Sequence, residues 1–120
     1  MKQLRLQLRR QPTDTPYCVP AALALITDAP VSEIEKNLRR YLGDQPISGI
    51  YYPLCLAVLS DRGIGFEEVF GPRAVGLYLC FNKSHAFVIS DRVYYDNSFP
   101  NGSAIHKMPR VSKCFEITRG

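Results

Sequence analysis

Residues 18–26 (CVPAALALI) carry almost no polar side chain, and no other stretch constrains the fold as strongly. Proline is tolerated in the first turn of a helix, so Pro20 predicts a helix that starts beside Cys18. A helix of this composition must be buried on most sides. The free amides and the dipole at its start favour a thiolate, although buried cysteines are also commonly inert. The stretch therefore predicts a central helix that holds a thiol at its first turn.

Two more helices are predicted after this one. Ser32 and Glu35 fit a capping box, in which a side chain and the backbone satisfy each other's donors. A helix is therefore expected over residues 33–42, closed by Gly43. The apolar run 54–59 predicts the third helix.

The remaining chain has the patterns of strands. Residues 4–8 alternate between leucine and polar residues, which predicts an N-terminal strand with one wet face. Residues 65–70 and 111–118 also read as strands, and the nearly continuous apolar run 74–81 is typical of a central strand buried on both faces. Helices followed by antiparallel strands predict an α+β fold, and the length predicts a single domain over residues 1–120.

A hairpin is predicted around the dipeptide 91–92. With a two-residue turn, Asp96 lies diagonal to His85 on one face of the hairpin, within reach of its ring. With a three-residue turn, His85 instead stands opposite Asn97. In the first register the shared face carries His85, Phe87, Ile89, Tyr94 and Asp96.

These residues form a candidate catalytic set. Cysteine peptidases need a thiol, an imidazole that takes its proton, and a polar group that orients the imidazole. Cys18 supplies the thiol, His85 the imidazole, and Asp96 or Asn97 the orienting group. The other imidazole, His106, lies beyond a loop without an acidic neighbour, so His85 is the preferred one.

Three stretches resemble a known family. Residues 15–24 (TPYCVPAALA) are similar to the cysteine helix of papain-like peptidases, especially the bacteriocin-processing C39-type branch, which carries Cys-Gly-Pro-Ala-Ala-Leu there. Residues 84–89 (SHAFVI) and 93–98 (VYYDNS) resemble the histidine and acid strands of that family. The hairpin is also similar to that of Josephin-type deubiquitinating domains.

The resemblance implies a papain-like fold, in which the cysteine helix packs on an antiparallel sheet. It implies that Cys18 is the nucleophile, that His85 is its base, and that a glutamine upstream helps to bind the oxyanion. The family places that glutamine five or six residues before the cysteine. Here Gln11 lies seven residues before it, with Thr13 and Asp14 as the other candidates for this role.

A second departure from the family pattern is Val19, which replaces the glycine after the cysteine and is expected to narrow the approach to the sulfur. The leading hypothesis is a cysteine peptidase or isopeptidase that acts on a peptide or protein. The alternatives are a catalytically inactive papain-like domain that binds a peptide or a partner protein, and a thiol acyltransferase or transglutaminase.

Composition excludes several other classes of function. The four cysteines are 37, 25 and 34 residues apart and form no zinc-binding pattern, so no metal or other cofactor is expected. The net charge of +4 comes without interleaved aromatics, which disfavours nucleic acid as a partner. No apolar run is long enough to cross a membrane and no signal peptide is visible, so a cytoplasmic protein is expected. Cys55, Cys80 and Cys114 are expected to be core residues.

Overall fold

The computed structural model describes residues 18–47, 52–82, 85–95, 102–104 and 110–119. In these residues three helices precede a six-stranded antiparallel sheet. The helices are α1 (Cys18–Thr27), α2 (Val31–Leu42) and α3 (Tyr52–Asp61). The strands are β1 (Gly65–Val69), β2 (Leu77–Asn82), β3 (His85–Ser90), β4 (Val93–Tyr95), β5 (Ser103–Ala104) and β6 (Lys113–Arg119). The predicted α+β class is confirmed.

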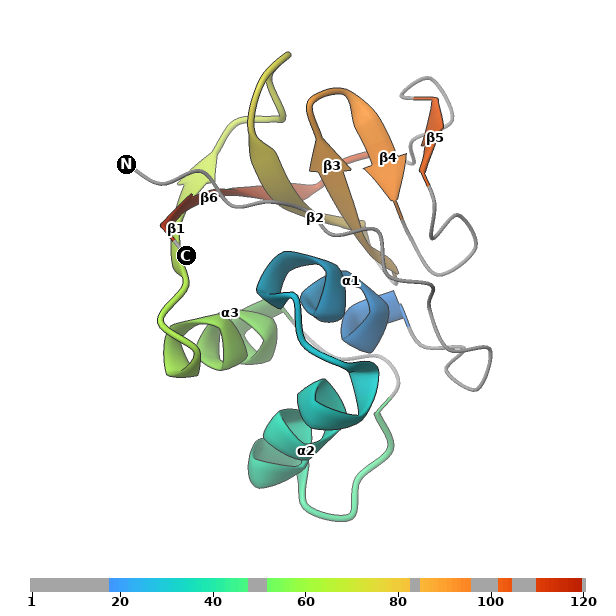
Figure 1. Cartoon of the computed structure of the whole chain (residues 1–120), viewed down its shortest axis with the longest axis vertical. Helices are drawn as coiled ribbons and strands as arrows, with labels where there is room; N and C mark the ends of the chain where they lie inside the picture. Colours follow the sequence, from blue (N-terminus) through green and yellow to red (C-terminus); the bar gives the residue numbers. More distant parts are fainter. Residues whose placement is uncertain (1–17, 48–51, 83–84, 96–101, 105–109, 120) are drawn as a thin grey trace.

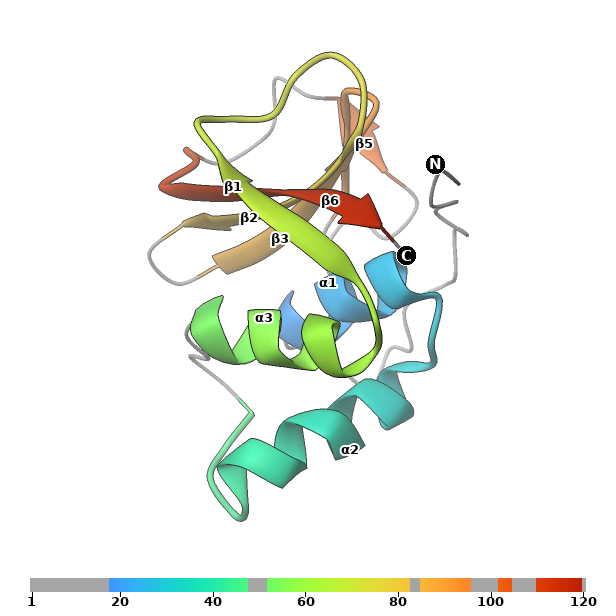
Figure 2. The ribbon, with the colours of Figure 1, turned by 90° about the vertical axis from the view of Figure 1, so that its left-hand side faces the viewer.

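The elements form layers. Helices α1 and α3 lie against one face of the sheet, and α2 lies beyond them, on the side away from the sheet (Figures 1 and 2). The strand order is β1-β6-β2-β3-β4-β5, so β2 and β3 occupy the middle. Every described residue of β2 except Asn82 is buried, which confirms the prediction of a central strand.

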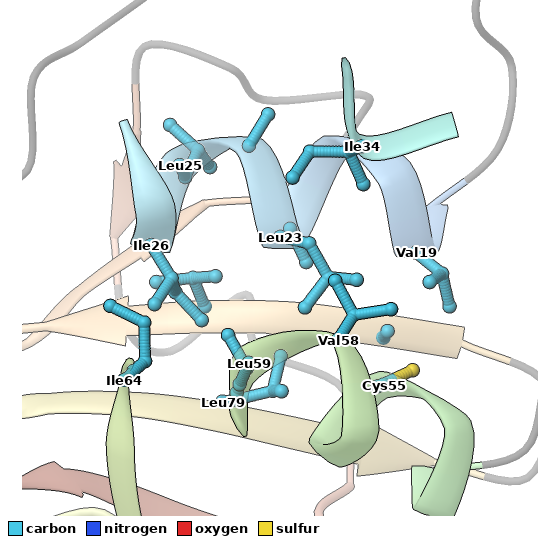
Figure 3. Close-up of a cluster of buried hydrophobic side chains, with 14 of the residues drawn as sticks. Val19, Leu23, Leu25, Ile26, Ile34, Cys55, Val58, Leu59, Ile64 and Leu79 are labelled. Atoms are coloured by element: carbon cyan, nitrogen blue, oxygen red, sulfur yellow. The ribbon is translucent and has the colours of Figure 1, made fainter. Parts of the chain in front are cut away.

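Helix α1 begins at Cys18 and is buried from Val19 to Ile26. Its side chains fill the space between the sheet and the other helices, where Leu23 contacts a cluster that includes Val58 and Leu79 (Figure 3). An almost wholly apolar helix is stable only in such a place, because each buried leucine contributes about 2 kcal/mol by leaving water. The buried central helix predicted by residues 18–26 is confirmed.

Helix α2 confirms one expected end and corrects the other. Gly43 closes the helix with φ 60°, and its N–H donates to the Arg39 carbonyl. The predicted capping box is wrong: the helix starts at Val31, Pro30 is its N-cap, and no side chain caps it. The ring of Pro30 fixes its φ at −61°, and the helix starts directly after it. Ser32 therefore lies inside the first turn and not at the cap.

Alternate residues along the central strands face two separate apolar clusters. Leu79, Ala86 and Val88 face the helices, whereas Cys80 and Phe87 belong to a cluster on the other face of the sheet. This second cluster contains Tyr78, Cys80, Phe87, Ile89, Tyr94 and Cys114. The sheet is therefore covered on both faces, which explains why β2 and β3 lack the wet side chains of a one-sided sheet.

The remaining expectations have mixed outcomes. The last strand was expected at 111–118 and runs from Lys113 to Arg119, and the short strand β5 was not predicted. The strand expected at residues 4–8 lies outside the described residues. Among the described helices, none has the length and apolar character that a membrane span requires.

Candidate active site

Cys18 is the first residue of α1, at the point where the helix has unpaired backbone amides. Pro20 follows in the same turn and is buried, so the start of the helix is anchored in the core. Of the four cysteines, all within the described residues, Cys18 is partly exposed and the other three are buried. The structure thus confirms the predicted helix N-terminus, and it leaves this one thiol within reach of a reagent.

The Cys18 sulfur lies against the start of β3. The backbone N–H of Ala86 donates a hydrogen bond to Cys18 Sγ, with 3.3 Å between nitrogen and sulfur. His85, the predicted imidazole, is the residue just before this amide and the first residue of β3. The fold therefore brings together the thiol and the backbone that carries the imidazole, although 67 residues separate them in the sequence.

The direction of the Ala86 amide follows from the register of the sheet. Asp91 N donates to the Gly76 carbonyl, in line with the pairing of β2 and β3, so odd-numbered residues of β3 direct their backbone groups toward β2. Ala86 therefore directs its N–H the other way. On that side the described part of β4 ends with Tyr95, opposite Val88. Cys18 Sγ accepts the hydrogen bond that a longer β4 would take.

The His85 ring stacks on Phe87, with centroids 5.8 Å apart and planes inclined by 22°. Phe87 lies in the cluster on the sheet face away from the helices, so this contact fixes the side on which the imidazole lies. Strand hydrogen bonds run close to the plane of a sheet, which places the sulfur near that plane beside residue 86. The ring and the sulfur thus flank the same short piece of backbone.

The hairpin confirms one of the two predicted registers. Asp91 and Arg92 form a two-residue turn with φ of 46° and 71°, as in a type I′ turn. Ile89 pairs with Tyr94, as the count for this turn predicts. Phe87 and Tyr94 share a face, with ring centroids 5.4 Å apart. The three-residue turn is therefore wrong.

Several predicted site residues lie outside the described part of the chain. These are Gln11, Thr13, Asp14, Asp96, Asn97 and His106. Their roles stay predictions, but the observed register is the one that predicted Asp96 as the orienting group. Asn97 was proposed for the register that the hairpin does not adopt.

Val19 contributes to the core. Its side chain is 5% exposed and belongs to the cluster that joins the helices to the sheet. In Figure 3 it lies at the same end of this cluster as Cys55 of α3. The Val19 side chain thus packs α1 in place.

Cys55 is a buried neighbour of the candidate nucleophile. Burial, with a smaller contribution from negative charge on Cys18, raises the pKa of the Cys55 thiol to about 12. Cys55 therefore remains a neutral thiol at physiological pH, as expected of a core residue. Cys80 and Cys114 are also buried, in agreement with prediction.

The Ala86 amide is not among the predicted site residues, because each of those was identified by its side chain. Alternation along the hairpin contains the signal, because it predicts which amides of β3 face away from β2. No group of three or more His, Cys, Asp and Glu side chains in the described ranges could hold a metal ion.

A scan of the sequence against protein-family models gave no match. Comparisons with curated proteins and with solved structures gave no significant match either. A functional proposal for this chain therefore rests on its own residues.

Proposed function

We propose that the chain is a papain-like thiol hydrolase that cleaves a peptide or isopeptide bond, with Cys18 as the nucleophile. The observation that carries the proposal is the hydrogen bond from Ala86 N to Cys18 Sγ at a helix N-terminus, one residue after His85. Two kinds of donor, the helix amides and a strand amide, favour negative charge on this sulfur. Neither Cys55, Cys80 nor Cys114 has such surroundings, since all three are buried.

In the proposed reaction the Cys18 thiolate adds to the substrate carbonyl and forms a C–S bond. The oxyanion that results is held by the Cys18 backbone N–H and by Gln11. The C–N bond then breaks, and the leaving amine takes a proton from His85, which Asp96 orients. Water, deprotonated by His85, attacks the thioester and releases the acid and the free thiolate. If an amine takes the place of water, the same steps give acyl transfer.

The Ala86 amide has a definite part in this scheme. A hydrogen bond to an ionised acceptor is about twice as strong as one between neutral groups, so the amide favours the thiolate over the thiol. The bond also directs the sulfur toward the strand that carries His85. Of the possible substitutions only Ala86→Pro removes this main-chain donor, so the contribution persists in every other variant that keeps the fold.

The thiol activation is tested by the rate at which iodoacetamide modifies each cysteine at pH 6, measured by peptide mass spectrometry. At this pH an ordinary thiol is about 0.3% ionised. We expect Cys18 to react about tenfold faster than N-acetylcysteine, while Cys55 in the same molecule stays unmodified. A Cys18 rate equal to that of N-acetylcysteine would overturn the activation.

The hydrolysis itself is tested by incubating the chain with a peptide library and sequencing new termini, with Cys18→Ala as the control. Cleavage by the wild type alone supports the proposal. Products joined to an added amine would assign acyl transfer instead. A fast-reacting Cys18 without cleavage or transfer would leave the inactive peptide-binding domain as the better description.

A further inference from the structure

Cys80 and Cys114 are two interacting thiols in the apolar cluster on the sheet face away from the helices. They lie directly opposite each other on β2 and β6, with 3.7 Å between the two sulfur atoms. Both are buried, at 0% and 1% exposure. Each is the nearest cross-strand neighbour of the other, so their contact follows from the register of the sheet.

The strand geometry at this pair suits a covalent link. Even-numbered residues of β2 direct their backbone groups toward β3, as the bond from Asp91 N to the Gly76 carbonyl shows. Cys80 and Cys114 therefore form a non-hydrogen-bonded pair of β2 and β6, the type in which opposite side chains are closest. Such pairs have Cα atoms about 4.5 Å apart, within the range that a disulfide spans.

A hydrogen bond joins the two thiols, and either sulfur can be its donor. This hydrogen bond, together with burial, raises the pKa of Cys80. The same hydrogen bond lowers the pKa of Cys114. When one of the two thiols ionises, the negative charge is accordingly favoured on Cys114, with Cys80 as the thiol beside it.

We propose that Cys80 and Cys114 are a site of reversible oxidation, at which a peroxide converts the two thiols into a disulfide that joins β2 to β6. The Cys114 thiolate attacks one peroxide oxygen and becomes a sulfenic acid, while the other oxygen leaves as water or alcohol. The Cys80 sulfur then attacks the sulfenic sulfur, the S–S bond forms, and the hydroxyl leaves as water with the Cys80 proton. The sulfurs lose two electrons in total and the peroxide gains them.

The neighbours of the pair limit the access of reagents to its two sulfur atoms. Val69 lies opposite Cys114 on β1, and Phe87 lies opposite Cys80 on β3, so the four side chains form one apolar row across the sheet. An oxidant or a reductant must reach one of the sulfur atoms, and this row of side chains slows its access. Oxidation should therefore need a small reagent and should proceed more slowly than modification of the exposed Cys18.

The test uses the full chain carrying Cys18→Ser, which removes the competing exposed thiol. The folded variant is treated with hydrogen peroxide, and then its intact mass and its disulfide peptide map are determined. We expect the loss of two hydrogen atoms, a peptide pair that contains Cys80 and Cys114, and an unfolding midpoint raised by about 10 °C, reversed by dithiothreitol. Adding Cys114→Ser should abolish all three effects.

Two results would overturn the proposal. One is that Cys80 and Cys114 stay reduced while the protein is folded and form their disulfide only in denaturant. The other is a map that links Cys55 to either residue in place of the Cys80 to Cys114 pair. Because the map is read on the parent variant, the result stands even if Cys114→Ser fails to fold.

Discussion

Cys18 and Cys80 show that the same type of side chain has very different surroundings in two regions of this molecule. Cys18 lies at a helix start, is partly exposed, and accepts a hydrogen bond from a backbone amide. Cys80 lies in the middle of the sheet, is fully buried, and is hydrogen-bonded to the thiol of Cys114. The first environment leaves the sulfur accessible beside backbone donors, and the second holds the sulfur against another thiol. Reactivity is thus set by the element that carries the sulfur.

The two faces of the sheet also differ in what they contribute to the surroundings of Cys18. The helix-covered face joins α1 to the strands, and α1 positions Cys18. The opposite face is filled by side chains of the strands and their ends, without any described helix. A change on the first face should therefore disturb the position of Cys18, whereas an equal change on the second should leave Cys18 in place and alter stability, as long as it spares the contact of Phe87 with His85.

Leu23→Ala and Ile89→Ala test this difference with the largest expected effect. Both side chains are 0% exposed, and each substitution removes three carbons, so each should lower the free energy of unfolding by about 3 kcal/mol. Of the two residues only Leu23 lies on α1. Hydrogen exchange of the Ala86 amide should therefore accelerate more in Leu23→Ala than in Ile89→Ala, after both rates are corrected for the change in global stability. Urea denaturation and exchange measured by NMR check both parts. Equal exchange rates in the two variants would contradict the role of α1.

Cys55 should make the stability fall at high pH. Its pKa is about 12 in the folded chain against 9.0 as the reference for the unfolded one, so between these values the unfolded state loses a proton that the folded state keeps. The free energy of unfolding should then drop by about 1.4 kcal/mol per pH unit above pH 9. Cys55→Ala should remove this part of the slope. Denaturation at pH 9, 10 and 11 measures it, and identical slopes in both proteins would refute the assignment.

His85→Gln should slow the modification of Cys18 by iodoacetamide at pH 6 about threefold, equivalent to about 0.65 kcal/mol. Without the imidazolium, the helix and the Ala86 amide alone favour the thiolate. His106→Gln is the matched control and should leave the rate unchanged. A loss of rate in the control and none in His85→Gln would transfer the role to His106.

The sequence predicted much of this fold, because apolar runs and turn residues carry strong local signals. The burial of residues 18–26, the central strand around 77–81 and the two-residue turn at 91–92 were all foreseen. Counting along the hairpin also placed His85 and Phe87 on one face, and their rings stack.

What the sequence did not predict depends on contacts between distant segments. Nothing near Ala86 shows that its amide meets Cys18, since the contact needs the packing of α1 on β3. The pairing of Cys80 with Cys114 likewise depends on β6 lying beside β2, which neither strand specifies alone. The prediction of where α2 starts was wrong for a local reason. Pro30 and Ser32 are both candidates for the N-cap, and the helix begins after Pro30.

The position of β6 has a consequence for how the chain is made. β6 lies between β1 and β2, yet it leaves the ribosome after both of them. Until it emerges, β1 has no partner in the described sheet, and one edge of β2 is open to misassembly. The pairings of β2, β3 and β4 and the packing of α1 on β3 do not involve β6, so the contact of Cys18 with Ala86 does not require the last strand, whereas the contact of Cys80 with Cys114 does.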